Sequence, residues 1–274
     1  MTDPLDVISA VRSASLAADS HDPLDEAASL RLKHHGLTGL DHWVDDIDGF
    51  ALLRDGQLDL AVVPSSRGRG IGGRLAKQAL ASDGAVTAWS HGNHPAAARL
   101  AERHGLARAR ELWVMRRPSS VLLPELVLPR DLSIRSFRDS DAEAVIAVNA
   151  AAFAAHPEQG NLDIAGLSER MAEPWFDPTG LLLAEDSEGT LLGFHWTKRH
   201  DDRLGEVYVV AISPAAQGRG LGRLLTLAGL HHLVARGVGE VLLYTESDNA
   251  PAVHVYSGLG FEHAPEDTHV QYQR

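Results

Sequence analysis

Two glycine- and arginine-containing stretches of the chain have residue types that could bind an anion. Residues 65–80 read SSRGRGIGGRLAKQAL and residues 215–230 read AAQGRGLGRLLTLAGL. In each copy a strand-like segment ends at a proline, Pro64 or Pro214, and a segment with helical periodicity follows the glycines. Glycine lets the backbone approach a ligand, and the free N–H groups and dipole of a helix N-terminus suit negative charge. Both stretches therefore predict a phosphate-binding loop, to which Arg69 and Arg219 add positive charge.

The glycine spacing discriminates among phosphate loops. The first copy satisfies the dinucleotide pattern G-x-G-x-x-G, but the second has Arg223 in place of the last glycine, and several strands precede each loop. Neither copy has the Gly-Lys-Ser/Thr ending of a Walker A loop. Both share arginine or glutamine, two residues, glycine, one residue and glycine, which resembles the pyrophosphate loop of the GNAT superfamily of acetyltransferases. A turn that only caps a helix is the alternative for a single copy, and the repetition favours a ligand loop.

The segment after the second loop extends the resemblance. VLLYTESDNAPAVHVYSGLGF resembles the strand, asparagine-led helix and Tyr-to-Gly-Phe ending typical of GNAT domains. The resemblance implies an α/β fold of two tandem GNAT domains, each a mixed twisted sheet flanked by helices, with acetyl-CoA as co-substrate. Its pyrophosphate would lie on the loop and its pantetheine arm along the preceding strand. The second-half residues implied at acetyl-CoA are Val210, Ala211, Ile212, Gln217, Gly218, Arg219, Gly220, Leu221, Gly222, Arg223, Asn249, Ala250, Pro251, Ala252, Val253 and His254. Those of the first half are Leu60, Ala61, Val62, Gly68, Arg69, Gly70, Ile71, Gly72 and Gly73.

Acetyl transfer by direct aminolysis needs a base for the amine and an acid for the departing thiolate. Glu206, in GEVYVVAI, and Tyr256, four residues before Gly260, match the base and acid positions that the resemblance implies.

The first half differs at these positions. Aligned through its final glycine, it has Ala101 at the position of Tyr256, and Asp59 is the candidate carboxylate near the position of Glu206. We therefore expect turnover in the second half and cofactor binding without turnover in the first. A purely structural first domain is the alternative.

A narrower resemblance concerns the acceptor. The runs AAFAAHPEQG, EPWFDPTGL, LLGFHWTKRH, LGEVYVVAISPAAQGRGLG and LLYTESDNAPAV resemble actinobacterial tandem GNAT enzymes that acetylate the cysteinyl amine of a cysteine–glucosamine–inositol precursor. This resemblance implies that the small-molecule substrate contacts Glu26, Glu158, Lys198, Glu206 and Tyr244. Carboxylates can accept hydrogen bonds from sugar hydroxyls and attract a cationic amine. The sequence around Glu26 departs from the pattern, and there a first-turn helix acid is the other interpretation.

Two other functions stay open. One is a GNAT enzyme that acetylates another amine, such as a protein N-terminus. The other is an acyl-CoA-binding regulatory protein without turnover.

The elements that must position these residues can be read along the chain. Residues 118–131, PSSVLLPELVLPRD, carry three prolines and predict an extended connector. We therefore expect domains at 1–118 and 131–274, joined by a linker at 119–130. LSIRSF predicts a strand, DSDAEAVIAVNAAAFAAH a helix, GLLLAEDSEGTLLGFHWTKR two strands and GEVYVVAISP another strand. In the first half DEAASLRLKHHG predicts a helix and HWVDDIDGFALLRDGQLDLAVVP short strands, with no clear counterpart of LSIRSF before residue 10.

Composition narrows the functional class. The chain has 274 residues, of which 44% are hydrophobic and 23% charged, and no apolar run approaches the roughly 18 residues of a membrane span. We expect a cytoplasmic protein, because the first twenty residues lack the pattern of a signal peptide. We also expect a monomer. The formal charge of -12 disfavours nucleic-acid binding. The absence of cysteine excludes disulfides and thiolate chemistry, and no metal is expected because the pairs His34–His35 and His231–His232 are adjacent and do not share a helix face.

Overall fold

The computed structural model describes residues 2–81, 84–154, 156 and 159–274, and these form two compact units. Unit 1 contains the described residues up to Trp113, together with Glu246–Asp248 and Ala264–Arg274. Unit 2 contains Val114–Thr245 and Asn249–His263. The last strand of the chain therefore belongs for most of its length to the unit built by the first half.

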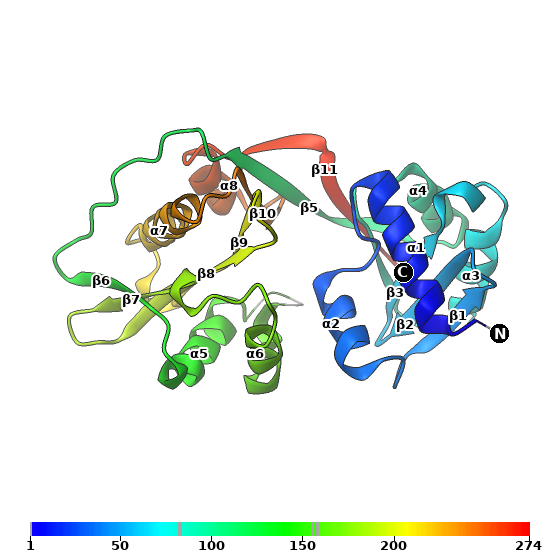
Figure 1. Cartoon of the computed structure of the whole chain (residues 1–274), viewed down its shortest axis with the longest axis horizontal. Helices are drawn as coiled ribbons and strands as arrows, with labels where there is room; N and C mark the ends of the chain where they lie inside the picture. Colours follow the sequence, from blue (N-terminus) through cyan, green and yellow to red (C-terminus); the bar gives the residue numbers. More distant parts are fainter. Residues whose placement is uncertain (1, 82–83, 155, 157–158) are drawn as a thin grey trace. The chain divides into compact units, whose positions relative to one another are not determined.

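Unit 1 is a mixed sheet with helices on both faces (Figure 1). Its helices are α1 (Pro4–Asp19), α2 (Glu26–His35), α3 (Ile71–Ala79) and α4 (Pro95–Arg103). Its strands are β1 (Asp41–Asp45), β2 (Gly49–Arg54), β3 (Gln57–Val62), β4 (Thr87–Ser90), the first part of β5 (Ala107–Pro118) and most of β11 (Glu262–Gln273). They lie in the order β1-β2-β3-β4-β11-β5. Strands β3 and β4 are parallel, whereas β11 runs antiparallel to β4.

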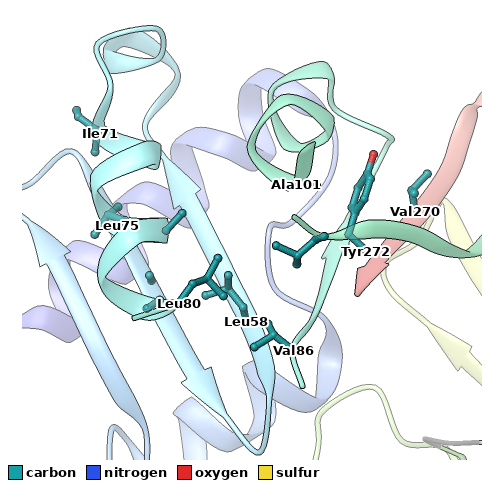
Figure 2. Close-up of a cluster of buried hydrophobic side chains, with 12 residues drawn as sticks. Leu58, Ile71, Leu75, Leu80, Val86, Ala101, Val270 and Tyr272 are labelled. Atoms are coloured by element: carbon teal, nitrogen blue, oxygen red, sulfur yellow. The ribbon is translucent and has the colours of Figure 1, made fainter. Parts of the chain in front are cut away.

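The core of unit 1 has two parts, because successive side chains of a strand point to opposite faces of the sheet. Leu58 of β3 packs toward α3 and α4, in the cluster that Figure 2 shows with Leu75 of α3, Ala101 of α4 and Tyr272 of β11. On the other face, Ala61 packs with buried residues of α1 and α2. Helix α1 was not anticipated from the sequence. Among the described residues no strand precedes it, which agrees with the missing counterpart of LSIRSF.

Unit 2 has the corresponding order with one more strand at its start (Figure 1). Its helices are α5 (Ala142–Ala152), α6 (Ile164–Met171), α7 (Leu221–Ala235) and α8 (Ala250–Ser257). Its strands are β6 (Leu132–Ser136), β7 (Leu181–Asp186), β8 (Leu191–Arg199), β9 (Leu204–Ile212) and β10 (Glu240–Glu246), with β5 contributing its residues from Val114 on. Short 3₁₀ turns occupy Asp139–Asp141, Gln159–Asn161, Pro178–Gly180 and Pro214–Ala216, and Pro64–Ser66 in unit 1. The sheet order is β5-β10-β9-β8-β7-β6.

Helices cover both faces of the unit 2 sheet. Phe194 and Trp196 of β8 are fully buried against α5 and α6, whereas Leu221 and Leu225 of α7 pack on the opposite face. The strands and helices expected from the sequence between 132 and 212 are confirmed, and the proline-rich connector has no helix or strand between Ser119 and Asp131. Across the described residues, no helix combines the length and apolar character needed to cross a membrane.

Candidate active site

The second glycine loop leads directly into helix α7, as the sequence predicts. Gly220 is the N-cap residue, with φ at +76°. Because glycine has no side chain, no side-chain hydrogen bond caps the first N–H groups of the helix. Among the described residues, no atom lies within 4 Å of where a Cβ at Gly220 or Gly222 would stand. Uncapped N–H groups at a helix N-terminus with open space beside them form a site for an anion such as a pyrophosphate.

Strand β9, which precedes this loop, is paired along only one edge near the loop. The parallel pairing with β10 joins Leu204–Val207 to Glu240–Leu243 and ends there, although β9 continues to Ile212. On its other edge β9 stays paired with β8 up to Ile212. Within the described chain, the edge of residues 210–212 that faces away from β8 therefore has backbone N–H and C=O groups without a strand partner. Such an edge can pair with an extended ligand that carries amides, as pantetheine does.

Glu206 lies on β9 just before this opening. It is the register partner of Lys198 on β8 and of Leu242 on β10. Its side chain is only 7% exposed, and its Oε2 lies 2.6 Å from Nε2 of His200. A buried carboxylate is costly without a polar partner, and here the imidazole supplies one.

A β-bulge shapes the strand beside Glu206. Trp196 pairs with Val209 but Thr197 pairs with Val207, so Tyr208 is an extra residue in β9.

The Nζ atom of Lys198 lies 4.7 Å from the ring centroid of Trp175 and 5.1 Å from that of Tyr208. These distances suit cation–π attraction. The phenol of Tyr208 also accepts a hydrogen bond from Nε of Arg170, at 2.9 Å.

These contacts define an aromatic–carboxylate cluster of Trp175, Lys198, His200, Glu206 and Tyr208. Of these five residues, only Lys198 and Glu206 were predicted from the sequence. Trp175 and His200 occur in the runs EPWFDPTGL and LLGFHWTKRH, which were used for resemblance and not for chemistry. The alternation of polar and aromatic residues in the second run was the available signal.

Tyr256 lies on α8, a helix of unit 2 that packs against α7. Its ring stands 6.0 Å from that of Phe261 in a T-shaped contact. Burial raises the pKa of the Tyr256 phenol to about 12, so the hydroxyl keeps its proton at neutral pH and can act as a donor. Asn249 has a structural function here, because its Oδ1 accepts the N–H of Ala252 and caps α8.

The remaining predicted substrate residues lie on different elements of the chain. Tyr244 lies on β10 beyond the part paired with β9 and is 43% exposed. Glu26 is the first residue of α2 and belongs to unit 1. Glu158 lies outside the described residues. Within unit 2, the structure places Lys198 directly opposite Glu206.

The first glycine loop has the same backbone form. Gly70 is the N-cap of α3, with φ at +82°. Its surroundings differ, however, because a Cβ at Gly72 would lie 3.2 Å from Cδ1 of Leu100 on α4, whereas the space at Gly222 is open. Arg67 is held by both carboxylate oxygens of Asp19, at 2.8 and 2.5 Å. Arg69 donates to Oγ of Ser66, and Arg219 of the second loop to Oδ2 of Asp131.

The strand register corrects the expectation for Asp59. Gly49 pairs with Val62 in unit 1 as Gly193 pairs with Ile212 in unit 2, and the strands can be compared pair by pair from there.

Arg54 pairs with Gln57 where Lys198 pairs with Glu206, so Gln57 occupies the position of Glu206. Asp59, the partner of Leu52, corresponds to Val209 and not to Glu206. The expectation was wrong because Asp59 lies five residues before Pro64, as Val209 lies five residues before Pro214, whereas Glu206 lies eight residues before Pro214.

The counterpart of Tyr256 agrees with the sequence alignment. Helix α4 begins after His94 as α8 begins after Asn249. The N–H of Leu106 donates to the carbonyl of Ala101 at 2.8 Å, and the N–H of Phe261 donates to that of Tyr256 at 3.1 Å. Ala101, which has no hydroxyl, therefore stands at the position of Tyr256.

Known proteins with similar sequences are acetyltransferases. The model of the acetyltransferase (GNAT) family matches residues 149–261. A mycothiol acetyltransferase of Nocardioides sp. is 56% identical over 99% of this chain and 98% of its own length. One from Rhodococcus jostii is 50% identical over 93% of this chain and 90% of its own length.

Two solved structures resemble the whole chain. A GCN5-related N-acetyltransferase from Sphaerobacter thermophilus has a TM-score of 0.72 at 20% identity, with 100% of this chain and 93% of that chain covered. A tandem GNAT protein from the clavulanic acid biosynthesis pathway has a TM-score of 0.71 at 19% identity, with 99% and 95% covered. These matches confirm the tandem GNAT fold.

Proposed function

We propose, on the premise that this chain belongs to the mycothiol acetyltransferases of the GNAT family, that it acetylates the cysteinyl amine of the cysteine–glucosamine–inositol precursor of mycothiol. The narrower resemblance of the sequence is to mycothiol synthase, and the relatives confirm it. As a member of this family the chain is an acetyl-CoA-dependent N-acetyltransferase acting in mycothiol biosynthesis.

Unit 2 binds the reacting acetyl-CoA in this proposal. The N–H groups at the start of α7 hold the pyrophosphate, and the unpaired edge of residues 210–212 pairs with the pantetheine arm. The observation that carries the assignment is the buried carboxylate of Glu206 on that same strand, where unit 1 has the amide of Gln57. An amide cannot take up a proton at neutral pH, so only unit 2 has a base at this position.

The chemistry is direct aminolysis of the thioester. The amine nitrogen forms a bond to the acetyl carbon, and the bond from that carbon to sulfur breaks. The substrate ammonium loses two protons overall, of which one ends on the sulfur of coenzyme A and the other in solvent. Glu206 accepts the first and frees the lone pair of the amine. Tyr256 donates its proton to the leaving sulfur, and the second proton of the nitrogen restores the phenol. A pKa of about 12 keeps Tyr256 protonated until the thiolate departs.

The aromatic–carboxylate cluster supports a sugar-containing acceptor. Trp175 and Tyr208 offer ring faces and the ammonium of Lys198 offers hydrogen-bond donors beside Glu206. We assign Lys198 to the acceptor on this basis, while Tyr244, Glu26 and Glu158 stay predictions from the resemblance. Unit 1 binds acetyl-CoA at its own loop without turnover in this proposal.

The decisive experiment supplies purified protein with acetyl-CoA and the synthetic precursor and follows both products by mass spectrometry. The expected result is mycothiol and free coenzyme A in equal amounts. A parallel reaction contains a peptide with a free N-terminus. Acetylation of the peptide and not of the precursor would replace the proposed acceptor. Binding of acetyl-CoA with neither product would instead indicate a regulatory binding protein.

A further inference from the structure

The proton taken up by Glu206 needs a route to water. Its side chain is 7% exposed, whereas that of His200, whose Nε2 lies 2.6 Å from Oε2 of Glu206, is 34% exposed. The imidazole thus connects a buried carboxylate with solvent. A carboxylate that stayed protonated after one turnover could not act as base in the next.

A tight turn fixes the position of His200. This residue directly follows β8, and its N–H donates to the carbonyl of Leu204 at 2.9 Å. The Oδ1 atom of Asp201 accepts the N–H groups of Arg203 and Leu204, at 2.6 and 2.9 Å. The backbone that carries the imidazole is therefore held against the start of β9, the strand that carries Glu206.

Charged residues on β8 and in the turn lie near this pair. Lys198 is the partner of Glu206 on β8, and Leu242, its partner on β10, is apolar. In the turn, the pKa of Asp201 is lowered by the N–H groups of Arg203 and Leu204 and, to a smaller extent, by the nearby His200. Arg199 pairs with Asp202 at the exposed end of the turn.

We propose that His200 is a positioning and proton-relay residue for Glu206, an inference that rests on the proposed function. In the Nδ1–H tautomer, Nε2 accepts the proton that Glu206 has taken from the substrate ammonium. The imidazolium then loses one proton to water, so one proton enters the pair and one leaves it. The same contact holds the carboxylate in one rotamer before the amine arrives.

Two substitutions separate holding from relay. Gln in His200→Gln keeps a polar group that can hold Glu206 but cannot carry its proton, whereas His200→Ala loses both. We expect kcat to fall by roughly tenfold in His200→Gln and by roughly 10²-fold in His200→Ala, with the KM for acetyl-CoA within about twofold of wild type. Added imidazole should restore part of the kcat of His200→Ala and none of that of His200→Gln. The matched control is His231→Ala, which removes a histidine of α7 that contacts the carbonyl of Pro124, and should keep full activity.

A measurement without substrate keeps this inference separate from the proposed function. The imidazole resonance of His200 is identified by its loss in His200→Gln and recorded by NMR at a single pH. Its position should change in Glu206→Gln, because the imidazole loses its carboxylate partner. A wild-type protein that makes no mycothiol would overturn the proposed function while this shift still reports the pair. Unchanged kcat in His200→Ala, or the same resonance position with and without the Glu206 carboxylate, overturns the relay.

Discussion

The two units share the backbone geometry of their glycine loops and differ in the side chains that could move a proton. In both loops the glycines before the helix have nearly the same geometry, with φ at +79° and +82° for Gly68 and Gly70 and at +78° and +76° for Gly218 and Gly220. In both, the strand before the loop leaves its parallel neighbour after a short pairing. Binding geometry of this kind belongs to the main chain and is therefore insensitive to most side-chain changes.

In the proposed mechanism, by contrast, the chemistry depends on two positions. Glu206 and Tyr256 of unit 2 correspond to Gln57 and Ala101 of unit 1. Unit 1 therefore keeps the loop geometry of unit 2 without a carboxylate or a phenol at these two positions. It also shows which substitutions would make unit 2 like unit 1.

The largest effect is expected from Glu206→Gln, which copies Gln57 into unit 2. The amide keeps the size of the side chain and cannot accept the substrate proton, so kcat should fall by roughly 10³-fold. Acetyl-CoA should bind with a Kd within about twofold of wild type, measured by calorimetry. The control is Gln57→Glu in unit 1, for which we expect no gain, because Ala101 supplies no acid there. Turnover near that of wild type in Glu206→Gln would remove this residue from the mechanism.

Tyr256→Phe tests the second position at a somewhat smaller cost. The variant keeps the ring contact with Phe261 and loses only the hydroxyl, so we expect kcat to fall by roughly 10²-fold at an unchanged melting temperature.

The pH profile provides a second readout for Tyr256. Because the pKa of its phenol is about 12, it stays protonated below about pH 10. A basic limb below that pH should have the same midpoint in wild type and in Tyr256→Phe. A limb that disappears in the variant would mean that the phenol titrates in the working range.

Much of this arrangement could be predicted from the sequence. The β-branched segments ending at Pro64 and Pro214 indicated the strands, and the glycine spacing indicated the loops at α3 and α7. These features are local, because turn geometry and helix starts depend on a few neighbouring residues. Glu206 and Tyr256 came from the resemblance and not from spacing alone.

What could not be predicted depends on pairing between distant segments. The assignment of β11 to unit 1 requires Val270 to pair with Ser90, and no local pattern encodes that register. The bulge at Tyr208 is a property of two strands together, and it makes Gln57 the counterpart of Glu206. His200 was missed for another reason, since its proposed role rests on a side-chain contact with Glu206 across a turn.

Substitution of the N-cap glycine compares the two loops directly. Valine at Gly220 or at Gly70 must adopt a positive φ, which costs roughly 1–2 kcal/mol for a residue with a Cβ. The strain disfavours the anion-binding form of the loop by about tenfold. Gly220→Val should therefore lower kcat/KM by roughly tenfold or more, whereas Gly70→Val should leave it within about twofold. Equal losses in the two variants, with equal melting temperatures, would mean that the first loop is required for turnover.

The smallest expected effect on activity concerns Asp59, the buried acid of unit 1. Burial, and secondarily the charge of Asp25, raise the pKa of Asp59 to about 7, above the roughly 3.9 of an unfolded aspartate. The folded state therefore binds more protons between about pH 4 and pH 7, and the contribution of Asp59 to stability falls as the pH rises through that range.

Asp59→Asn imitates the protonated acid and should remove this dependence. Relative to wild type, the variant should gain about 3 kcal/mol in unfolding free energy between pH 4.5 and pH 8, measured by urea denaturation at both values. Other titrating groups cancel in the difference between the two proteins. Its kcat should stay within about twofold of wild type, because Asp59 corresponds to Val209 and has no catalytic counterpart. If the stability difference were the same at both pH values, Asp59 would be ionised in the folded protein. Unit 1 would then contain a charged carboxylate on β3, and the proposed absence of turnover there would depend on Ala101 and Gln57 alone.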